Sequence, residues 1–300
     1  MKTICGHGVA IITPFKKNGE IDFNAIPHII EHLISGGVDF FVVLGTTAET
    51  ASLTKEEKIN LVDEVVYFNA GRLPIVLGLG GNDTQQTLDM FDWFNLQAFS
   101  AILSVSPYYN KPNQEGLYQH FKRIASHSSL PLILYNVPSR TGVNIAPETV
   151  LRLANDFENI IALKEASGDF QQAQTLIKLC PTGFSILSGD DETSLPIILA
   201  GAKGVISVIG NAIPNIYSKL IKLGLVRDVD KAYTYQYKIL DLIRMIYDEG
   251  NPTGIKVLMD ALGLCENNLR LPLVAASNEL TLRLKNELKN VLPLQNLNTD

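Results

Sequence analysis

Short runs of apolar and β-branched residues alternate along this chain with longer amphipathic stretches. Each short run is typical of a buried parallel strand, and each longer stretch is typical of a helix that covers the sheet. Eight strands are predicted, at residues 9–13, 40–44, 74–79, 101–105, 132–135, 160–163, 184–187 and 204–208. Helices are predicted between them at 23–35, 54–69, from 83 onward, 114–127, 146–155, 169–178 and 191–200, with Asp22, Thr54 and Asp83 as N-terminal caps.

Eight strands that alternate with helices are the number that closes an α/β barrel, so the predicted fold is a (β/α)8 TIM barrel within residues 1–224. Strand signals stop near Gly224, and helical patterns continue at 228–248, 252–262 and 277–292. Residues 225–300 are therefore predicted to form a C-terminal helical region. An open doubly wound sheet is the alternative, although the glycine-rich stretch at 78–83 lacks the third glycine of a dinucleotide site.

Composition narrows the classes of partner. The 300 residues carry a net charge of −6 without a basic cluster, which favours a small-molecule substrate over nucleic acid. Cys5, Cys180 and Cys265 are far apart and odd in number, which favours a reducing cytoplasm. The N-terminus does not resemble a signal peptide, and no apolar run approaches the ~20 residues of a membrane span. We expect a cytoplasmic protein without a membrane partner.

Lys164 directly follows the apolar run at 160–163, where a strand would leave the core. Partial desolvation there disfavours the charged ammonium, and a neutral amine can attack a ketone to form a Schiff base. A lysine at a strand end can also simply extend its ammonium to water. The choice between these readings depends on the other strand ends, because they converge on one mouth of a barrel.

Two tyrosines and a threonine at other strand ends could move protons. Tyr135 ends the neighbouring predicted strand and could supply a phenol near Lys164. The hydroxyl of Thr46 could pass a proton between Tyr135 and a second phenol, that of Tyr109. A tyrosine with a satisfied hydroxyl in the core, and ordinary turn residues, are the structural alternatives.

Carboxylate binding is suggested at two further strand ends. Backbone N–H groups of residues 45–47, together with the hydroxyl of Thr47, could hold one carboxylate. The planar guanidinium of Arg140 matches a second carboxylate. An ordinary turn and an exposed loop arginine are the alternatives, but the combination suits Schiff-base chemistry on an acid.

Six motifs resemble the dihydrodipicolinate synthase (4-hydroxy-tetrahydrodipicolinate synthase) family of the pyruvate-dependent class I aldolases. They are GTTAE at 45–49, SPYYNKP at 106–112, LYNVPSRTG at 134–142, LKEASGD at 163–169, LSGDD at 187–191 and GVISV at 204–208. The resemblance covers essentially the whole chain. It implies a homotetramer, a dimer of dimers, that condenses pyruvate with L-aspartate 4-semialdehyde in lysine and diaminopimelate biosynthesis, without a metal or another cofactor.

The resemblance also implies roles for individual residues. Lys164 would form the pyruvate imine, and Tyr135, Thr46 and Tyr109 would form a proton relay in which Tyr109 is completed across a subunit interface. Thr47 and the backbone at Ile206 would hold pyruvate, Arg140 would bind the carboxylate of the aldehyde, and Gly189 would belong to the wall of the site.

Two positions depart from the family pattern. Ala48 stands where the family often has glycine, which the turn tolerates if its φ is negative. A lysine-binding site is implied at Ala51, Asn82, Gln86 and Tyr108, but Gln86 replaces the glutamate of lysine-inhibited members. Losing that carboxylate would weaken the hold on an ammonium, so the hypothesis is weak or absent feedback inhibition by lysine.

Other enzyme classes remain as alternatives. N-acetylneuraminate lyase and ketodeoxygluconate-type aldolases share the lysine and tyrosine, but Arg140 and the Thr46–Thr47 pair favour the synthase. His28, Glu31 and His32 match the H-x-x-E-H pattern of some zinc peptidases. These three residues lie on the polar face of an amphipathic helix, so a solvated face is the preferred interpretation.

The remaining polar residues near the motifs are interpreted structurally. Asp190 and Asp191 are expected to cap the following helix rather than to act in catalysis. Glu165 should point away from the Lys164 side of its strand, which makes it an improbable general base. His7, His120 and His127 belong to no visible constellation and are expected to be structural or exposed.

Overall fold

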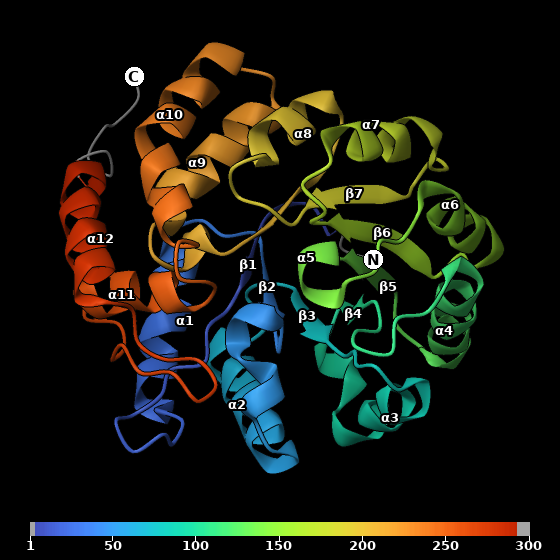
Figure 1. The fold of residues 1–300 in the computed structure, drawn as a ribbon, viewed down its shortest axis with the longest axis horizontal. Helices are drawn as coiled ribbons and strands as arrows, with labels where there is room; N and C mark the ends of the chain where they lie inside the picture. The colour runs from blue at the N-terminus through green and yellow to red at the C-terminus, as the bar shows by residue number, and fades with distance from the viewer. Residues whose placement is uncertain (1–3, 293–300) are drawn as a thin grey trace.

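Eight parallel strands close into a barrel in sequence order, β1 to β8, in the computed structural model, which describes residues 4–292 (Figure 1). The strands are β1 (Gly6–Ala10), β2 (Phe40–Val43), β3 (Ile75–Gly78), β4 (Ala101–Val105), β5 (Leu132–Asn136), β6 (Ile160–Glu165), β7 (Ser185–Ser188) and β8 (Gly204–Ser207). Strand β1 pairs with β8, with Gly8 opposite Ile206, and this pairing closes the sheet. The predicted barrel is confirmed, and the open sheet is excluded.

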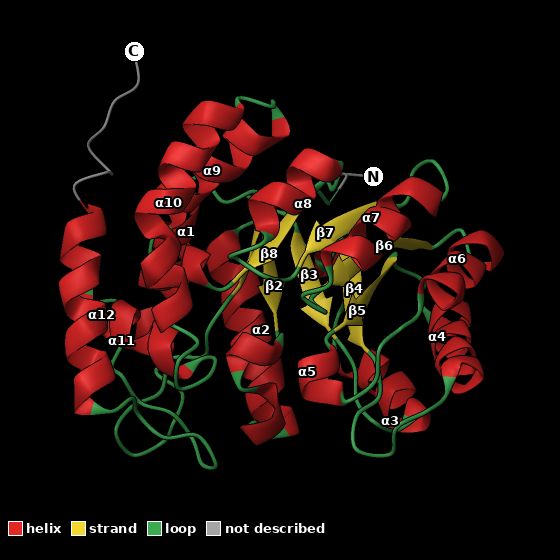
Figure 2. Cartoon of the chain, turned by 45° about the horizontal axis from the view of Figure 1, so that its top comes forward, coloured by secondary structure: helices red, strands yellow, loops and turns green. Residues whose placement is uncertain are grey.

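Helices surround the strands on the outside (Figure 2). They are α1 (Ile26–Ser35), α2 (Lys55–Asn69), α3 (Thr84–Asp89), α4 (Gln114–His127), α5 (Pro138–Thr141), α6 (Pro147–Asp156), α7 (Phe170–Leu179), α8 (Ser194–Ala200) and α9 (Pro214–Leu225). Short 3-10 helices lie at η1 (Phe23–Ala25), η2 (Thr46–Ala48), η3 (Thr50–Ser52), η4 (Met90–Trp93), η5 (Leu96–Ala98) and η6 (Ile209–Asn211). The sequence did not predict α5 or α9.

The predicted N-terminal caps are present. The Thr54 hydroxyl accepts the N–H of Glu57, whose carboxylate accepts the N–H of Thr54, so α2 begins with a reciprocal capping box. Asp83 caps α3. Asp22 caps the 3-10 turn that leads into α1 instead of capping α1 itself.

Three helices follow the barrel at the left of Figure 1, namely α10 (Val229–Met245), α11 (Thr253–Ala261) and α12 (Asn278–Val291). Helix α10 packs against α9, and α12 packs against both α10 and α11. On α12, one apolar face is buried, formed by Leu280, Leu284, Leu288 and Val291. The predicted C-terminal helices are confirmed with ends shifted by a few residues. Residues 1–3 and 293–300, at the ends of the two predicted regions, lie outside the described residues.

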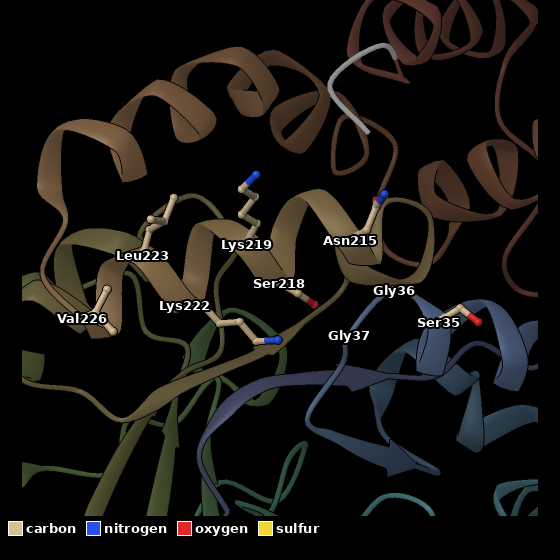
Figure 3. A pocket seen from close by; sticks show the side chains of 9 residues that line it. All are labelled: Ser35, Gly36, Gly37, Asn215, Ser218, Lys219, Lys222, Leu223 and Val226. Carbon is tan, nitrogen blue, oxygen red and sulfur yellow. The ribbon is translucent and has the colours of Figure 1, made fainter. Parts of the chain in front are cut away.

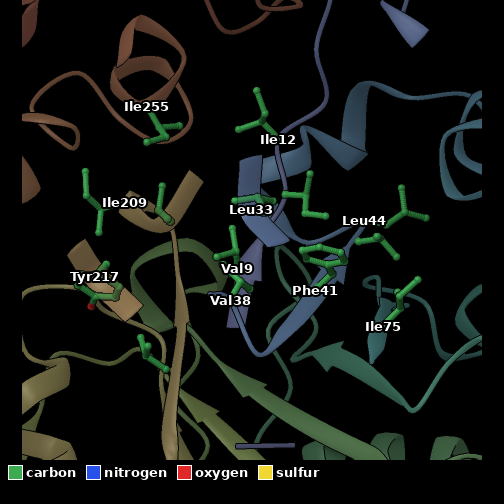
Figure 4. Packing of buried hydrophobic residues seen from close by; sticks show 14 of the residues in the cluster. Val9, Ile12, Leu33, Val38, Phe41, Leu44, Ile75, Ile209, Tyr217 and Ile255 are labelled. Carbon is green, nitrogen blue, oxygen red and sulfur yellow. The ribbon is translucent and has the colours of Figure 1, made fainter. Parts of the chain in front are cut away.

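Two apolar clusters fill the inside and the outside of the barrel. The inner cluster includes Phe40, whose ring passes directly over the backbone of Gly8, where an added Cβ would lie 2.1 Å from the ring. The outer cluster lies between strands and helices, and Figure 4 shows Val9, Leu33 and Phe41 within it. The alternation of side chains along each strand separates the two clusters.

Strand β1 is shifted from its prediction. It spans Gly6–Ala10 rather than residues 9–13. The extent of this strand is set by the residues of β2 and β8 that pair with it, and the apolar pattern of residues 9–13 alone does not reveal those partners. Residues 11–13 leave the sheet but remain buried. Among residues 4–292, no helix combines the length and the apolar character that a membrane crossing needs.

Candidate active site

Lys164 and Tyr135 lie side by side inside the barrel, near the C-terminal ends of their strands. They are directly opposite each other in the register of β5 and β6. The Nζ of Lys164 lies 4.3 Å from the centre of the Tyr135 ring. Only 5% of Lys164 and 6% of Tyr135 are exposed, so the amine does not extend into bulk water. The structure therefore brings together a sheltered amine and a phenol.

The backbone of Gly189 packs against the stem of Lys164. A Cβ at this glycine would lie 3.0 Å from Cε of Lys164 and 2.6 Å from Cβ of Ala166. The N–H of Gly189 donates to the carbonyl of Glu165 at 2.7 Å, which fixes this approach. Gly189 thus forms a wall of the space around Lys164, and any side chain here would displace the lysine.

The turn after β2 carries Thr46 and Thr47 on the 3-10 helix η2. Thr47 is 2% exposed, and its Oγ1 accepts a hydrogen bond from Nδ2 of Asn251 at 3.1 Å. Ala48 is in the same 3-10 turn, and the positive φ of 52° falls on the next residue, Glu49. Ala48 itself does not have a positive φ, so the turn tolerates alanine at this position.

A buried ion pair anchors the end of this turn to the C-terminal helices. The Nζ of Lys256 lies 2.5 Å from Oε1 of Glu49, and neither side chain is more than 2% exposed. Lys256 also donates to the carbonyl of Asn268 at 2.7 Å, and the N–H of Arg270 donates to Oε2 of Glu49 at 3.1 Å. Burial lowers the pKa of Lys256, and the neighbouring Glu49 carboxylate opposes that shift. Sequence reasoning missed this anchor, because its partners are 207 residues apart.

Arg140 and Tyr109 lie on the surface of the single chain. Arg140 is exposed on α5, and its Nη2 donates to the carbonyl of Asn251 at 3.4 Å. Asn251 therefore contacts both Thr47 and Arg140. Tyr109 is 91% exposed and has a φ of 70°, so within one chain it does not enter the barrel. Ile206 is on β8 and is buried in the inner cluster.

Asp191 does not cap α8, which corrects the prediction. It is buried, and its Oδ2 accepts the N–H groups of Val208 at 3.0 Å and Ile209 at 2.8 Å. The carboxylate thus joins β7 to the end of β8, and burial raises its pKa. Asp190 accepts the N–H of Thr193, the residue before α8, so it closes the turn that leads into that helix.

The four residues of the implied lysine site lie at the surface of the single chain. Ala51 is exposed on η3, Gln86 is exposed on α3, and Tyr108 is 40% exposed after β4. Asn82 is half-buried, and its carbonyl accepts Nδ2 of Asn110 at 2.8 Å. Their binding role stays a prediction.

The H-x-x-E-H motif lies on the outer side of α1. His28 and Glu31 are exposed, as predicted, and Glu31 pairs with Arg72 at 2.7 Å. The prediction is wrong for His32, which is half-buried against the backbone at residues 211–212 and whose pKa burial lowers. Within residues 4–292, no three His, Cys, Asp or Glu side chains gather in a way that could hold a metal ion.

Two further histidines are structural. Nδ1 of His7 lies 2.7 Å from Oγ of Ser218, and Nδ1 of His120 lies 2.9 Å from Oγ1 of Thr84. Burial lowers the pKa of His7 to about 3 and the pKa of His120 to about 4. His127 packs edge-on against the ring of Phe91.

A pocket of about 390 Å³ lies between the end of α1 and α9, away from the residues above (Figure 3). It is lined by Ser35, Gly36, Gly37, Asn215, Ser218, Lys219, Lys222, Leu223 and Val226. Gly36 and Gly37 precede β2, so the pocket is at the end of the barrel opposite Lys164. Figure 3 shows Lys222 and Ser218 directed toward Gly37 while Lys219 points away, so its polar groups do not converge on one ligand position.

Comparison with known proteins places this geometry in context. Residues 4–291 match the dihydrodipicolinate synthetase family. The 4-hydroxy-tetrahydrodipicolinate synthase of Flavobacterium psychrophilum is 52% identical over 284 residues, which cover 95% of this chain and 97% of that protein. The 4-hydroxy-tetrahydrodipicolinate synthase from Methylacidiphilum fumariolicum SolV superposes with a TM-score of 0.94 at 39% identity, over 97% of both chains. Dihydrodipicolinate synthase from Aquifex aeolicus superposes with a TM-score of 0.93 at 39% identity, over 98% of this chain and 100% of that one.

Proposed function

The chain belongs to the dihydrodipicolinate synthetase family, and we propose that Lys164 performs its chemistry by forming an imine with pyruvate. The activity is that of a 4-hydroxy-tetrahydrodipicolinate synthase, a lyase of the class I aldolase type in lysine and diaminopimelate biosynthesis. The observation that carries the role of Lys164 is its position, 5% exposed and opposite Tyr135 inside the barrel.

The reaction begins with attack of the neutral amine of Lys164 on the ketone carbon of pyruvate. The carbinolamine that forms loses water and becomes a protonated imine, which withdraws electrons from the pyruvate methyl group. The methyl group then loses a proton, and the resulting enamine forms a carbon–carbon bond with the aldehyde carbon of L-aspartate 4-semialdehyde, whose oxygen takes up a proton. The amino group of the semialdehyde then attacks the imine carbon and displaces the amine of Lys164, which is free to react again. Tyr135 serves as the proton carrier, because its ring centre lies 4.3 Å from Nζ and its phenol is sheltered with the amine inside the barrel.

The proton route continues from Tyr135 through Thr46 to Tyr109. Since 91% of Tyr109 is exposed in one chain, its phenol is available to complete the route in a neighbouring subunit. We assign the assembly as a homotetramer, a dimer of dimers, in the cytoplasm. Sedimentation velocity of the purified protein tests this, because a single monomeric species would contradict it.

Two groups hold the carboxylates. Thr47 and the backbone at Ile206 hold pyruvate, and the Thr47 hydroxyl is oriented by the amide of Asn251. Arg140 binds the carboxylate of the aldehyde, since its guanidinium is exposed beside Asn251 and can form a two-point contact. Gly189 leaves space for the imine beside Lys164.

Borohydride trapping tests the role of Lys164. The protein is incubated with pyruvate, reduced with borohydride and digested, and the masses of the peptides are measured by mass spectrometry. The peptide that contains Lys164 should carry one reduced pyruvyl group. Lys164→Met should carry none, whereas Lys203→Met, which removes an exposed lysine before β8, should be labelled like the unaltered chain. A label on another lysine, or no label, would overturn the proposal.

The acceptor is tested by steady-state kinetics. The enzyme should consume pyruvate and aspartate semialdehyde together, and it should not cleave N-acetylneuraminate. The reverse result would assign the chain to a sister aldolase.

A further inference from the structure

Strand β6 does not keep one register along β5. Leu132 lies opposite Ile160, but the next residue, Ile133, lies opposite Ala162, so Ile161 is an extra residue in β6. Ile161 and Ala162 both pack with the inner cluster. This bulge lies three residues before Lys164 and sets the direction of every side chain after it.

The register decides whether Lys164 can reach pyruvate at all. Because side chains alternate along a strand, a shift by one residue would turn Lys164 toward the helices and bring its neighbour into the barrel. Above the bulge, Tyr135 lies opposite Lys164, and Asn136 lies opposite Glu165. The first pair faces the interior and the second pair faces outward.

The outward-facing pair, Asn136 and Glu165, is buried and hydrogen-bonded. Nδ2 of Asn136 lies 3.2 Å and 3.1 Å from the two carboxylate oxygens of Glu165, and the two residues are 0% and 2% exposed. Glu165 also accepts the N–H of Ser167 at 2.7 Å and Nε2 of Gln172 at 3.0 Å. On the other side, Oδ1 of Asn136 accepts the N–H of Ile145 at 2.9 Å.

These bonds make the observed register the favoured one. Within residues 4–292, no lysine or arginine forms an ion pair with Glu165, so its carboxylate depends on N–H donors alone. A slip of β6 by one residue would take the carboxylate away from Nδ2 of Asn136 on β5, and a buried carboxylate that loses a donor is disfavoured. The bulge at Ile161 directs the side chain of Lys164 into the barrel. The hydrogen bonds between Asn136 and Glu165 stabilise the register that the bulge creates.

We propose that Asn136 and Glu165 are positioning residues, whose hydrogen bonds on the outer face of the barrel hold Lys164 opposite Tyr135. The proposal rests on the role of Lys164 in the proposed function. It gives Glu165 a purpose that is separate from acid–base catalysis, because its side chain lies on the other side of the sheet from the amine.

Reciprocal substitutions test the pair. Glu165→Gln removes the charge and one of the two acceptor oxygens that Nδ2 of Asn136 contacts, and Asn136→Asp places a carboxylate against Glu165, so each single change weakens the pair. The rate at which pyruvate and borohydride label Lys164, measured per folded molecule, should fall about 10- to 100-fold in each, as expected for a misplaced reacting group. The double variant Asn136→Asp/Glu165→Gln restores one donor against one acceptor and should label within about threefold of the unaltered chain.

Tyr118→Phe is the matched control. It removes a hydrogen bond of 2.8 Å to Asp156, between α4 and α6 on the outside of the barrel, without touching the ends of β5 and β6. Its labelling rate should match that of the unaltered chain. Circular dichroism of each variant supplies the folded fraction.

The outcomes separate this inference from the proposed function. If the unaltered chain is not labelled at Lys164, both fail. If it is labelled and the folded single variants label equally fast, or the double variant stays as slow as the single ones, only the positioning role is overturned. If the single variants do not fold, recovery of folding and labelling in the double variant supports the pair, and a double variant that folds without labelling overturns it.

Discussion

Replacing Lys256 with methionine tests whether the C-terminal helices hold the turn that carries Thr46 and Thr47. Lys256 is fully buried, 2.5 Å from Glu49 at the end of that turn. Methionine is unbranched and flexible enough to fill the space of the lysine stem, so the main change is loss of the ammonium. Glu49 then keeps the N–H of Arg270, at 3.1 Å, but loses its cation.

The expected loss of stability is large. Removing one partner of a buried ion pair costs about 3–5 kcal/mol, because the other charge stays buried and uncompensated. Unfolding entropy is about 2.1 cal/mol/K per residue, so over 300 residues this loss lowers the unfolding midpoint by about 5–8 °C. We also expect a higher KM for pyruvate, because the turn before Glu49 holds Thr47.

Thermal unfolding followed by circular dichroism measures the shift, with two comparison variants. Lys231→Met removes the exposed pair with Asp228 and should leave the midpoint unchanged, since exposed pairs contribute little. Lys256→Met/Glu49→Gln should recover most of the loss, because a neutral amide oxygen still accepts the N–H of Arg270. A midpoint for Lys256→Met within about 1 °C of the unaltered chain, or a double variant no more stable than the single one, would refute the reasoning.

Four further outcomes are expected. Gly189→Ala should slow labelling of Lys164 by about tenfold or more, because the new methyl group would lie 3.0 Å from its Cε; mass spectrometry showing an unchanged rate would contradict that packing. Arg140→Ala should raise the KM for aspartate semialdehyde far more than the KM for pyruvate in steady-state assays, and equal increases would count against its role. Burial lowers the pKa of His7 from 6.5 to about 3, so the stability that its neutral form supports is complete above pH 6.5 and falls as the pH drops toward 3, by up to about 1.4 kcal/mol per pH unit. Urea unfolding of His7→Asn at pH 7 and pH 5 should show a shallower pH dependence than the unaltered chain, and an equal one would exclude His7 as its source. Lysine should inhibit weakly or not at all, because Gln86 carries no carboxylate; strong inhibition at low lysine concentration in the same kinetic assay would contradict this.

The barrel could be predicted because its signals are local. Each apolar run is bounded by polar turn residues, and residues such as Thr54 and Asp83 cap the helices that the sequence indicated. The positions of Lys164 and Tyr135 at the ends of adjacent strands also followed from the sequence. The helix α9 was missed although Pro214 at its start and its apolar spacing were visible signals.

Features that depend on distant partners could not be predicted. The bulge at Ile161 has no signature in the run of apolar residues around it, because any of them fits either face of a buried strand. Asp191 has the sequence position of a helix cap, yet its N–H donors come from residues 208–209. A single sequence does not show which backbone will meet a carboxylate across the barrel.

The C-terminal helices contribute to the mouth of the barrel as well as extending the chain. Asn251 orients the hydroxyl of Thr47 and contacts Arg140, and Lys256 binds Glu49 at the other end of the same turn. A turn of three 3-10 residues has few hydrogen bonds of its own, so these outside contacts fix its conformation. The amine of Lys164 is therefore oriented by the register of β6, whereas the turn that carries Thr46 and Thr47 is oriented by residues more than 200 positions later in the chain.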